Sequence, residues 1–491
     1  MNLKRALCLF VVLLLSVSIV GCIEKPTDST SSAAGTESES SAYKDENGLY
    51  ISKLPYQDFE NREFKILVRG KVFDTYQSDD FTTDSELYGD LLNDAVARRN
   101  NYIEEKYHVK LTVIKSDTIN EDIRNEAAAN SGAYDAIMPA IPALASFAQS
   151  GYLYDLKSLN NFFEDAPWWD PNATKIFTID NKLYFTTGDI TILNKVCTPS
   201  ILFNKDMVQE HGLENPYQLV RDMQWTFDKF VQMAKSVTVI NSLDQRTAKE
   251  NTFGLLTSNG DALAFYGASG ETLCGKDEND EPYITFNRER SINVAKKVLE
   301  TLANGDFAVF AEEFEKPIWV TSLNAFIEGR ILFRPSGFSA TTKIRKQSDL
   351  NFGIVPFPLW DDTQDRYYSY CTNGQVAGIA IPKSCDDPEF SAYMIDIYAA
   401  AAKNFITPAY YEVNLRTRDA RDDESLEMLD IIFSNIVYDI GEAYNFGSIG
   451  TMLNTMLTNR ETEVISRFEA IEGQVQADID KTIIAYQSDM E

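Results

Sequence analysis

Apolar and polar positions alternate along residues 60–140 in two rhythms, one typical of strands and one typical of helices. Short apolar runs bounded by glycine or polar residues predict strands, whereas apolar positions three or four residues apart predict helices. The elements expected in order are a strand at 64–69, a helix, a strand at 109–114, a second helix at 120–129 and a strand at 134–139. The first helix is expected to begin with a capping box at Thr83–Glu86 and to bury Leu92, Val96, Ile103 and Tyr107 on one face. This alternation predicts a parallel sheet within an α/β lobe.

A second set of elements is expected after Asp189. Residues 176–187 fit a hairpin around Asp180 and Asn181, and Gly188 with Asp189 fits a crossover between the two sets. The later elements expected are strands at 253–256, 352–358 and 376–382, helices that begin at Thr226 and Asp387, a helix at 288–304, and a mostly helical region from 424 onward with a break near 445–450. The pattern therefore predicts a second α/β lobe.

The charge of the chain narrows the classes of function. The formal net charge is −29 over 491 residues. Binding of nucleic acid depends on clustered Lys and Arg and is therefore not expected. His108 and His211 are the only histidines, and no H-E-x-x-H sequence occurs, which argues against a histidine-rich metal site. The sequence predicts neither a metal nor a cofactor.

Four cysteines are widely spaced in the part of the chain expected to fold. They are Cys197, Cys274, Cys371 and Cys385, and they form no C-x-x-C sequence. One or two disulfides in an oxidising compartment and buried free thiols both fit this arrangement, and the sequence does not define a pairing.

The N-terminus has the pattern of an export signal. Lys4 and Arg5 precede an apolar run that ends at Val20, which is too short to span a bilayer comfortably. The sequence around Gly21 and Cys22 resembles the lipobox of a bacterial lipoprotein. That resemblance implies removal of residues 1–21, a lipid on Cys22 and a location on the outer side of the cell membrane. The alternatives for this segment are an uncleaved membrane helix and a plain secretory signal. Residues 22–56 are predicted to be a disordered tether.

Five short motifs occur in one order along the chain. They are N-K-D-M at 204–207 with H-G-L at 211–213, W-T-F-D-K-F at 225–230, F-I-E-G-R at 326–330, the strand at 352–358, and the segment 377–382 with the helix start at Asp387. Together they resemble the extracellular solute-binding proteins of bacterial ABC importers, the class that includes maltose-binding proteins. Residues 405–450 match no motif of that class.

The resemblance implies a fold with two α/β lobes, the type II periplasmic-binding-protein-like fold. Its ligand cleft lies between the lobes, which are joined by crossing hinge strands, and ligand contacts to both lobes favour closure. The expected lobes are residues 57–188 with part of about 378–440, and residues 189–377 with part of about 441–491.

Eight residues are candidates for ligand contact. In sugar-binding members of the class, an aromatic residue that stacks on the ligand follows a glycine after the F-x-x-G-K segment, and the matching position here is Phe338. The other candidates are the aromatic residues Trp168, Trp169, Tyr367, Tyr368 and Tyr370, and the hydrogen-bonding residues Arg69 and Asp189. Each of them also fits a structural role, either in the core or on an exposed loop. Ligands of open sheets bind beyond the carboxyl ends of the strands, which draws attention to the loops after Gly70 and Pro139.

The sequence as a whole predicts a lipid-anchored receptor that delivers a solute, a carbohydrate or oligosaccharide, to the permease subunits of an ABC importer, and that acts as a monomer. A receptor for a peptide or another polar solute and a sensory or adhesive surface protein are the alternatives on the same fold. A secreted glycosidase with two carboxylates is the rival enzyme. No nucleophile elbow or phosphate loop occurs, so the chain is not expected to be an enzyme.

Overall fold

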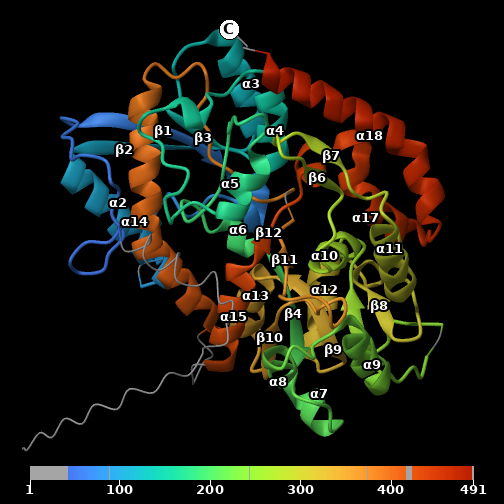
Figure 1. Cartoon of the computed structure of the whole chain (residues 1–491). Helices are drawn as coiled ribbons and strands as arrows, with labels where there is room; N and C mark the ends of the chain where they lie inside the picture. Colours follow the sequence, from blue (N-terminus) through green and yellow to red (C-terminus); the bar gives the residue numbers. More distant parts are fainter. Residues whose placement is uncertain (1–41, 88, 243, 373, 416–422, 489–491) are drawn as a thin grey trace, which may run out of the picture. The chain divides into compact units, whose positions relative to one another are not determined.

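A parallel three-stranded sheet organises the first part of the chain. The computed structural model describes residues 42–87, 89–242, 244–372, 374–415 and 423–488, so the expected signal peptide at 1–21 and Cys22 lie outside it. The sheet has the order β2–β1–β3, with β1 at Arg62–Arg69, β2 at Val109–Ser116 and β3 at Ala136–Met138 (Figure 1). The apolar run of β1 is fully buried, as expected for a parallel strand that is covered on both faces. The strands predicted here are confirmed.

The helices that connect these strands are α2 (Leu91–Tyr107) and α3 (Ile119–Ala129). The predicted capping box at 83–86 is wrong, because Ser85–Leu87 forms a separate 3₁₀ turn, η2. α2 begins later, where the carboxylate of Asp90 accepts hydrogen bonds from the first-turn N–H groups of Leu92 and Asn93. These contacts satisfy backbone donors that the helix itself leaves free, and they define the start of the helix.

The second sheet has five strands in the order β10–β4–β9–β5–β8. Its strands are β4 (Pro199–Asn204), β5 (Phe253–Thr257), β8 (Ala308–Phe310), β9 (Ile331–Gly337) and β10 (Phe352–Val355). β5 runs parallel to β8 and β9, whereas β4 runs antiparallel to β9 and β10. We call the parts built on the three-stranded and five-stranded sheets the first and second lobes.

Helices α7, α8, α9, α12, α13 and α15 pack against the second sheet. α9 (Phe227–Val237) begins as predicted, since the hydroxyl of Thr226 accepts a hydrogen bond from Lys229 N. The other bounds are α7 (Lys205–Glu210), α8 (Pro216–Arg221), α10 (Asp261–Ala268), α11 (Glu289–Leu302), α12 (Ile318–Ile327) and α13 (Ser339–Gln347).

The chain passes between the lobes more than once. The extended segment 377–382 returns to the first lobe, where Ala380 pairs with Ile137 and Ile379 pairs with Thr186. The predicted strand at 376–382 is therefore present as single bridges rather than as a continuous ladder. The predicted hairpin at 176–187 is shorter than expected, because Pro171–Phe177 is helix α5 and only the turn at Asp180 and Asn181 has hairpin geometry.

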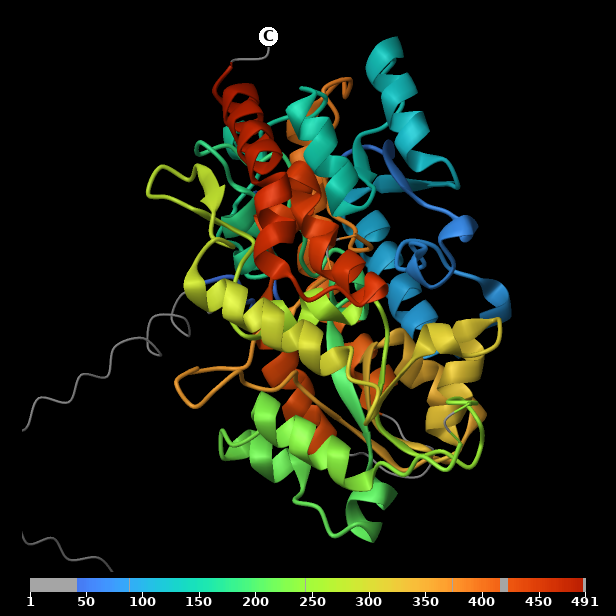
Figure 2. The ribbon, with the colours of Figure 1, turned by 90° about the vertical axis from the view of Figure 1, so that its right-hand side faces the viewer.

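The long helix α14 (Pro388–Leu415) packs against α2 of the first lobe, and α15 (Asp423–Ser434) packs against β10 of the second (Figure 1). The last helices, α17 (Ile449–Asn459) and α18 (Val464–Gln487), lie beside α11 (Figure 2). α18 also contacts α4 (Ile141–Gln149) of the first lobe, where Gln149 Nε2 donates to Thr482 Oγ1 at 2.6 Å. The C-terminal helices therefore contact both lobes.

The folded chain begins earlier than predicted. The tether expected at 22–56 gives way to packed structure at Tyr43, whose buried ring packs edge-on against Trp168 with 5.3 Å between centroids. Further along, Tyr50 N donates to Asn404 Oδ1 at 2.9 Å, and Ser52 Oγ donates to Asp396 Oδ2 at 2.5 Å. These contacts with α14 offset the entropy lost on ordering a polar segment.

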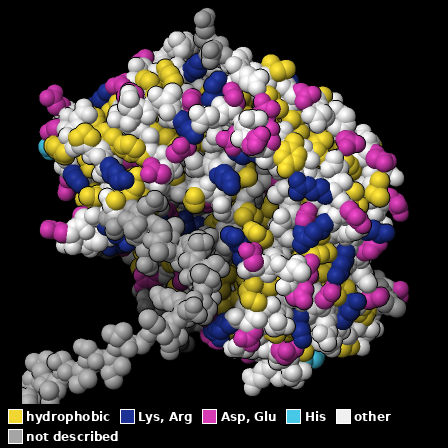
Figure 3. Space-filling view, viewed as in Figure 1, with side chains coloured by type: hydrophobic (Ala, Val, Ile, Leu, Met, Phe, Trp, Pro, Cys, Tyr) yellow, Lys and Arg dark blue, Asp and Glu magenta, His cyan; other side chains and the backbone are white. Residues whose placement is uncertain are grey.

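The remaining elements are short. They are α6 (Leu193–Val196), α16 (Ile440–Tyr444), β6 (Cys274–Lys276), β7 (Pro282–Ile284), β11 (Ser369–Tyr370), β12 (Ile436–Val437), η1 (Lys71–Tyr76), η3 (Leu156–Ser158), η4 (Ala311–Glu313) and η5 (Phe446–Ser448). Among the described residues, no helix is long and apolar enough to cross a membrane. On the face shown in Figure 3, Lys and Arg side chains are interspersed with Asp and Glu side chains.

Candidate functional site

A hollow of about 560 Å³ lies between the two lobes, and we call it the cleft. One wall is η1, which follows β1 of the first lobe. The other wall consists of the carboxyl ends of β5 and β9 with the first turns of α10, α12 and α13. Ligands of open α/β sheets bind at such strand ends, and the volume is within the range of small-molecule sites. The cleft is therefore our candidate ligand site, and its η1 wall belongs to the loop after Gly70 that the sequence singled out.

The floor of the cleft contains a buried arginine. Arg334 on β9 is 6% exposed, and its Nη1 is enclosed without a hydrogen-bond partner among the described residues. Burial lowers the pKa of the Arg334 guanidinium to about 10, against the attraction of Asp261. Burying a charged group without a partner costs free energy, so this side chain is poorly satisfied by the protein alone.

Asp261, at the start of α10, provides a carboxylate on the same side of the cleft as Arg334. Its Oδ2 accepts hydrogen bonds from Thr257 Oγ1 at 2.8 Å and from Ser258 N at 2.7 Å. Burial raises the pKa of Asp261 to about 6, although these hydrogen bonds act to lower it. The carboxylate is thus held by its own strand end, beside a series of hydroxyl groups.

An exposed tryptophan lies at the edge of the cleft. Trp319, in the first turn of α12, is 56% exposed, and its neighbour Val320 is 52% exposed. On the opposite wall, Phe73 and Tyr76 of η1 line the same hollow. Large apolar side chains exposed around a concave site are typical of ligand contact.

Sequence reasoning missed Trp319 and Arg334. Helical spacing places Trp319 on the same face as Leu323 and Phe326, which are buried, so the pattern alone suggests a core position. Arg334 directly follows the buried apolar run 331–333 of β9. A charged residue within a buried strand is unusual, and this feature of the sequence could have identified Arg334 as a candidate.

A smaller hollow of about 280 Å³ lies beside the crossover between the lobes, and we call it the crossover pocket. Asp189 is one of the residues that line it. The Asp189 carboxylate accepts hydrogen bonds from Lys195 Nζ at 3.0 Å, Lys403 Nζ at 2.8 Å and Thr407 Oγ1 at 2.7 Å. Burial acts to raise the pKa of Asp189, but the two ammonium groups outweigh it and hold this pKa well below its usual range. The carboxylate therefore joins the crossover to α14.

The structure brings three of the predicted site residues together at the crossover pocket. Trp168, Trp169 and Asp189 all line it. Both indoles are buried, and Trp168 Nε1 donates to Asp396 Oδ1 at 2.9 Å. Gly188 is required here because a Cβ at this position would collide with the backbone of Trp168.

Phe338 lies between the two hollows. It directly follows Gly337, which lines the cleft, while its ring packs against Phe433 of the crossover pocket with 4.9 Å between centroids. The side chain is 1% exposed and lines neither hollow. Its predicted contact with ligand stays a prediction.

The three predicted tyrosines lie away from the cleft. Tyr367 is buried and donates to Val220 O at 3.2 Å, and Tyr370 is buried and donates to Glu442 Oε2 at 2.8 Å. Tyr368 is half-buried and lies against Gly270. Their ligand contacts likewise stay predictions.

Arg69 is buried at the end of β1 behind the η1 wall. Its Nη2 donates to Gln375 O at 2.8 Å, and its guanidinium lies 5.6 Å from the ring centroid of Phe73. Its Nε and Nη1 have no hydrogen-bond partner among the described residues. Arg69 thus adds a buried positive charge close to the cleft without lining it.

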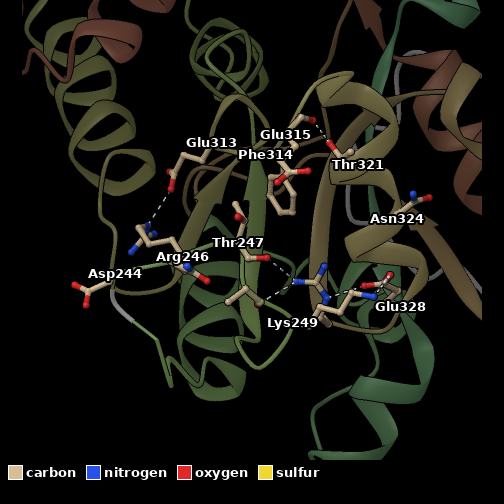
Figure 4. Close-up of a pocket in the computed structure, with 13 residues that line it drawn as sticks. Asp244, Arg246, Thr247, Lys249, Glu313, Phe314, Glu315, Thr321, Asn324 and Glu328 are labelled. Atoms are coloured by element: carbon tan, nitrogen blue, oxygen red, sulfur yellow. Dashed lines mark hydrogen bonds and ion pairs between the residues drawn. The ribbon is translucent and has the colours of Figure 1, made fainter.

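A third hollow of about 750 Å³ lies on the second lobe between the loop 244–249 and the segment from η4 to α12 (Figure 4). Its three cationic side chains, Arg246, Lys249 and Arg330, each form an ion pair with a carboxylate. Arg246 Nε lies 3.0 Å from Glu313 Oε2, and Lys249 Nζ lies 3.5 Å from Glu328 Oε1. The cationic side chains of this hollow are therefore already paired within the chain.

The described residues contain no group of three or more His, Cys, Asp or Glu side chains that could hold a metal ion. The four cysteines of the folded part are buried free thiols, which is one of the two arrangements that the sequence left open. Burial raises the pKa of the Cys197 and Cys385 thiols.

Comparison with known proteins defines the class. The chain matches the family of bacterial extracellular solute-binding proteins over residues 99–403 and belongs to that family. No curated protein matches the chain. The family and the fold class expected from the sequence motifs are confirmed.

Solved structures share the type II fold. An ABC substrate-binding protein from Listeria monocytogenes in complex with cycloalternan is 14% identical, with 86% of this chain and 99% of that chain covered and a TM-score of 0.53. A maltose-binding periplasmic protein from the same organism, in complex with maltose, is 17% identical, with 86% and 98% covered and a TM-score of 0.54. A cyclo/maltodextrin-binding protein complexed with maltotetraose is 15% identical, with 90% and 100% covered and a TM-score of 0.53. At these identities the likeness shows the fold.

Proposed function

We propose that this solute-binding protein is the carbohydrate receptor of an ABC importer and that the cleft between the lobes binds an oligosaccharide. The observation that carries the proposal is the exposed indole of Trp319 beside the hydroxyl-bearing residues of the cleft. Sugars present C–H patches that suit an aromatic face and hydroxyls that need hydrogen-bond partners. Thr257 and Ser258 at the end of β5, Ser336 at the end of β9 and Ser339 after β9 line the same hollow.

Several structural neighbours support a saccharide ligand, since they were solved with cycloalternan, maltotetraose, maltose and tagatose. Family and neighbours are substrate-binding receptors, so we propose binding and release rather than catalysis. The ligand would contact both lobes and favour closure about the crossover, because only contacts that differ between two states shift their balance.

The test is a thermal-shift screen of the mature protein against a panel of oligosaccharides and peptides. A bound ligand raises stability by about 2.7 kcal/mol at a hundredfold excess over Kd. A saccharide that raises the melting temperature of the wild type, with a smaller effect on Trp319→Ala, supports the proposal. Stabilisation by peptides alone would refute the carbohydrate assignment and favour a peptide receptor.

We also propose that the protein is a monomeric lipoprotein anchored through Cys22 to the outer side of the cell membrane, where the importer permease subunits receive the ligand. The lipobox-like sequence at 19–22 supports this proposal. Two acyl chains are sufficient for stable membrane attachment. Cys22→Ser should release the protein or leave it unprocessed, and a mass spectrum with an unacylated Cys22 in the wild type would contradict the anchor.

A further inference from the structure

Arg334 is a buried arginine of the second lobe whose guanidinium has no hydrogen-bond or ion-pair partner among the described residues. Its side chain forms no hydrogen bond and no ion pair with a described residue, and its Nη1 is enclosed. Arg246, by contrast, pairs with Glu313 and also donates to Gly305 O at 2.9 Å and Ala308 O at 2.5 Å. Because buried polar groups are almost always paired in native proteins, an unpaired guanidinium that lines a cavity points to a group that is supplied from outside the chain.

Asp261 is the carboxylate that attracts Arg334, but it does not neutralise the guanidinium. Asp261 attracts it but forms no ion pair with it, and Asp261 Oδ2 is occupied by Thr257 and Ser258. Lys343 on α13 also lines the cleft and is exposed, and it too has no ion pair with a described residue. This wall of the cleft therefore presents two cationic side chains without counter-ions.

The opposite wall limits where a negative group can lie. The η1 residues that line the cleft are Phe73, Asp74 and Tyr76, so this wall contributes no cationic side chain to the cleft. Among the described residues that line the cleft, Arg334 and Lys343 are the cationic side chains, so the complementary position for an anion lies on the β9 side, between them. A planar guanidinium binds a carboxylate or a sulfate through two parallel hydrogen bonds, which suits recognition in a buried site.

We propose that the saccharide bound in the cleft is acidic, with a carboxylate or a sulfate ester bound by Arg334 and assisted by Lys343. This inference rests on the proposed carbohydrate-receptor function and makes Arg334 its specificity-determining residue. Trp319 contacts the sugar ring, and the arginine selects the charged substituent. Neutral saccharides leave the guanidinium buried and unpaired, so they bind more weakly than their acidic counterparts.

The experiment is a glycan array probed with the full mature protein, in which uronic-acid oligosaccharides, sulfated oligosaccharides and their neutral counterparts are spotted as matched pairs. Calorimetry on the strongest matched pair then gives both dissociation constants. We expect the acidic member to bind at least tenfold more tightly, with affinity that falls as salt rises. Comparison of the uronic-acid oligosaccharides with the sulfated oligosaccharides shows which kind of acidic group is bound. Inorganic sulfate alone measures how much the anion contributes without a sugar.

The variants are Arg334→Gln and, as the matched control, Arg246→Gln. Arg334→Gln should abolish the preference for the acidic member, whereas Arg246→Gln should keep it. Arg334→Met provides a readout that needs no ligand, because removal of an unpaired buried charge should leave the melting temperature of the free protein equal to or above that of the wild type.

Three results overturn the inference. Equal affinity for both members of every pair, or an acid preference that survives Arg334→Gln, refutes the acidic ligand while leaving a carbohydrate receptor intact. A marked loss of stability in Arg334→Met assigns the arginine to the structure instead. Absence of binding to any saccharide, acidic or neutral, refutes the proposed function itself and the inference with it.

Discussion

The carboxylate of Asp189 and the ammonium of Lys403 lie 2.8 Å apart, and they connect the crossover between the lobes to the long helix α14. Lys195 contacts the other carboxylate oxygen at 3.0 Å. All three side chains are largely buried. An ion network at this position ties the segment about which the lobes would move to an element that packs on the first lobe.

Replacement of Lys403 by methionine should destabilise the protein by about 1–3 kcal/mol at pH 7, because a buried charged acceptor loses a partner. The network lowers the pKa of Asp189 in the folded state, so its stabilisation is present above the unfolded carboxyl pKa of about 3.9 and is lost as the pH falls through the folded value. The stabilities of wild type and variant should therefore begin to converge below about pH 4 and continue to converge as the pH falls toward the folded pKa. Denaturant unfolding at pH 7 and in acid measures both effects.

Lys296→Met is the matched control, since Lys296 forms an exposed pair with Glu300 at 3.8 Å. Such pairs contribute about 0–1 kcal/mol. Equal losses in the two variants would contradict a special role for the crossover network.

Asp396 should make the protein more stable in mild acid. It accepts hydrogen bonds from Trp168 Nε1 and Ser52 Oγ, yet burial raises its pKa to about 7. A folded pKa above the unfolded value means that the folded state binds the proton more tightly, so this stabilisation is full below about pH 4 and is lost as the pH rises toward 7.

Asp396→Asn removes the titrating group while retaining an oxygen acceptor. The wild type should gain about 2 kcal/mol relative to this variant when the pH is lowered from 7 to 5. Denaturant titrations at pH 5, 6 and 7 follow the difference, and a difference that is constant across the three values would show that Asp396 does not titrate in this range.

Trp319→Ala should weaken saccharide binding by about tenfold or more, because an aromatic contact at a ligand site contributes strongly to affinity. The melting temperature of the free protein should change little, since the indole is 56% exposed. Calorimetry and thermal unfolding separate the two quantities. Tyr283, which is 39% exposed on β7 and outside the cleft, offers the control variant Tyr283→Ala with unchanged affinity.

Phe338→Ala should lower the stability of the free protein by about 3–5 kcal/mol, as expected when a buried phenylalanine is truncated. The ring packs on Phe433, which would have to move before Phe338 could stack on a ligand. Thermal unfolding of the free variant measures the packing contribution, and calorimetry measures any effect on binding. A variant of unchanged stability would contradict the core position and restore the stacking role predicted from the sequence.

The local pattern of apolar and capping residues was sufficient to predict much of the architecture. The strands at β1 and β2, the start of α9 at Thr226 and the start of α14 at Asp387 follow from apolar spacing and capping residues, which act over a few neighbouring positions. The start of α2 was misplaced, because both the segment 83–86 and Asp90 offer capping side chains, and spacing alone does not choose between them.

The residues of the candidate site could be predicted less well from the local sequence pattern. Trp168, Trp169 and Phe338 were selected because aromatic residues suit sugars, and all three are buried in the folded chain. The sequence shows what a side chain can do but not which other segment covers it. Phe338 is covered by Phe433, which lies 95 positions away along the chain.

The sequence by itself determined the alternation of strands and helices, the family and the acidic character of the chain, since these depend on residue type and short-range spacing. Only the tertiary structure decided which side chains face the cleft. Arg334 lies in a buried strand, and Trp319 shares its helix face with the buried residues Leu323 and Phe326. Both nevertheless line the hollow that forms where η1 of the first lobe approaches the strand ends of the second. Such an approach joins residues far apart in sequence, and no local pattern encodes it.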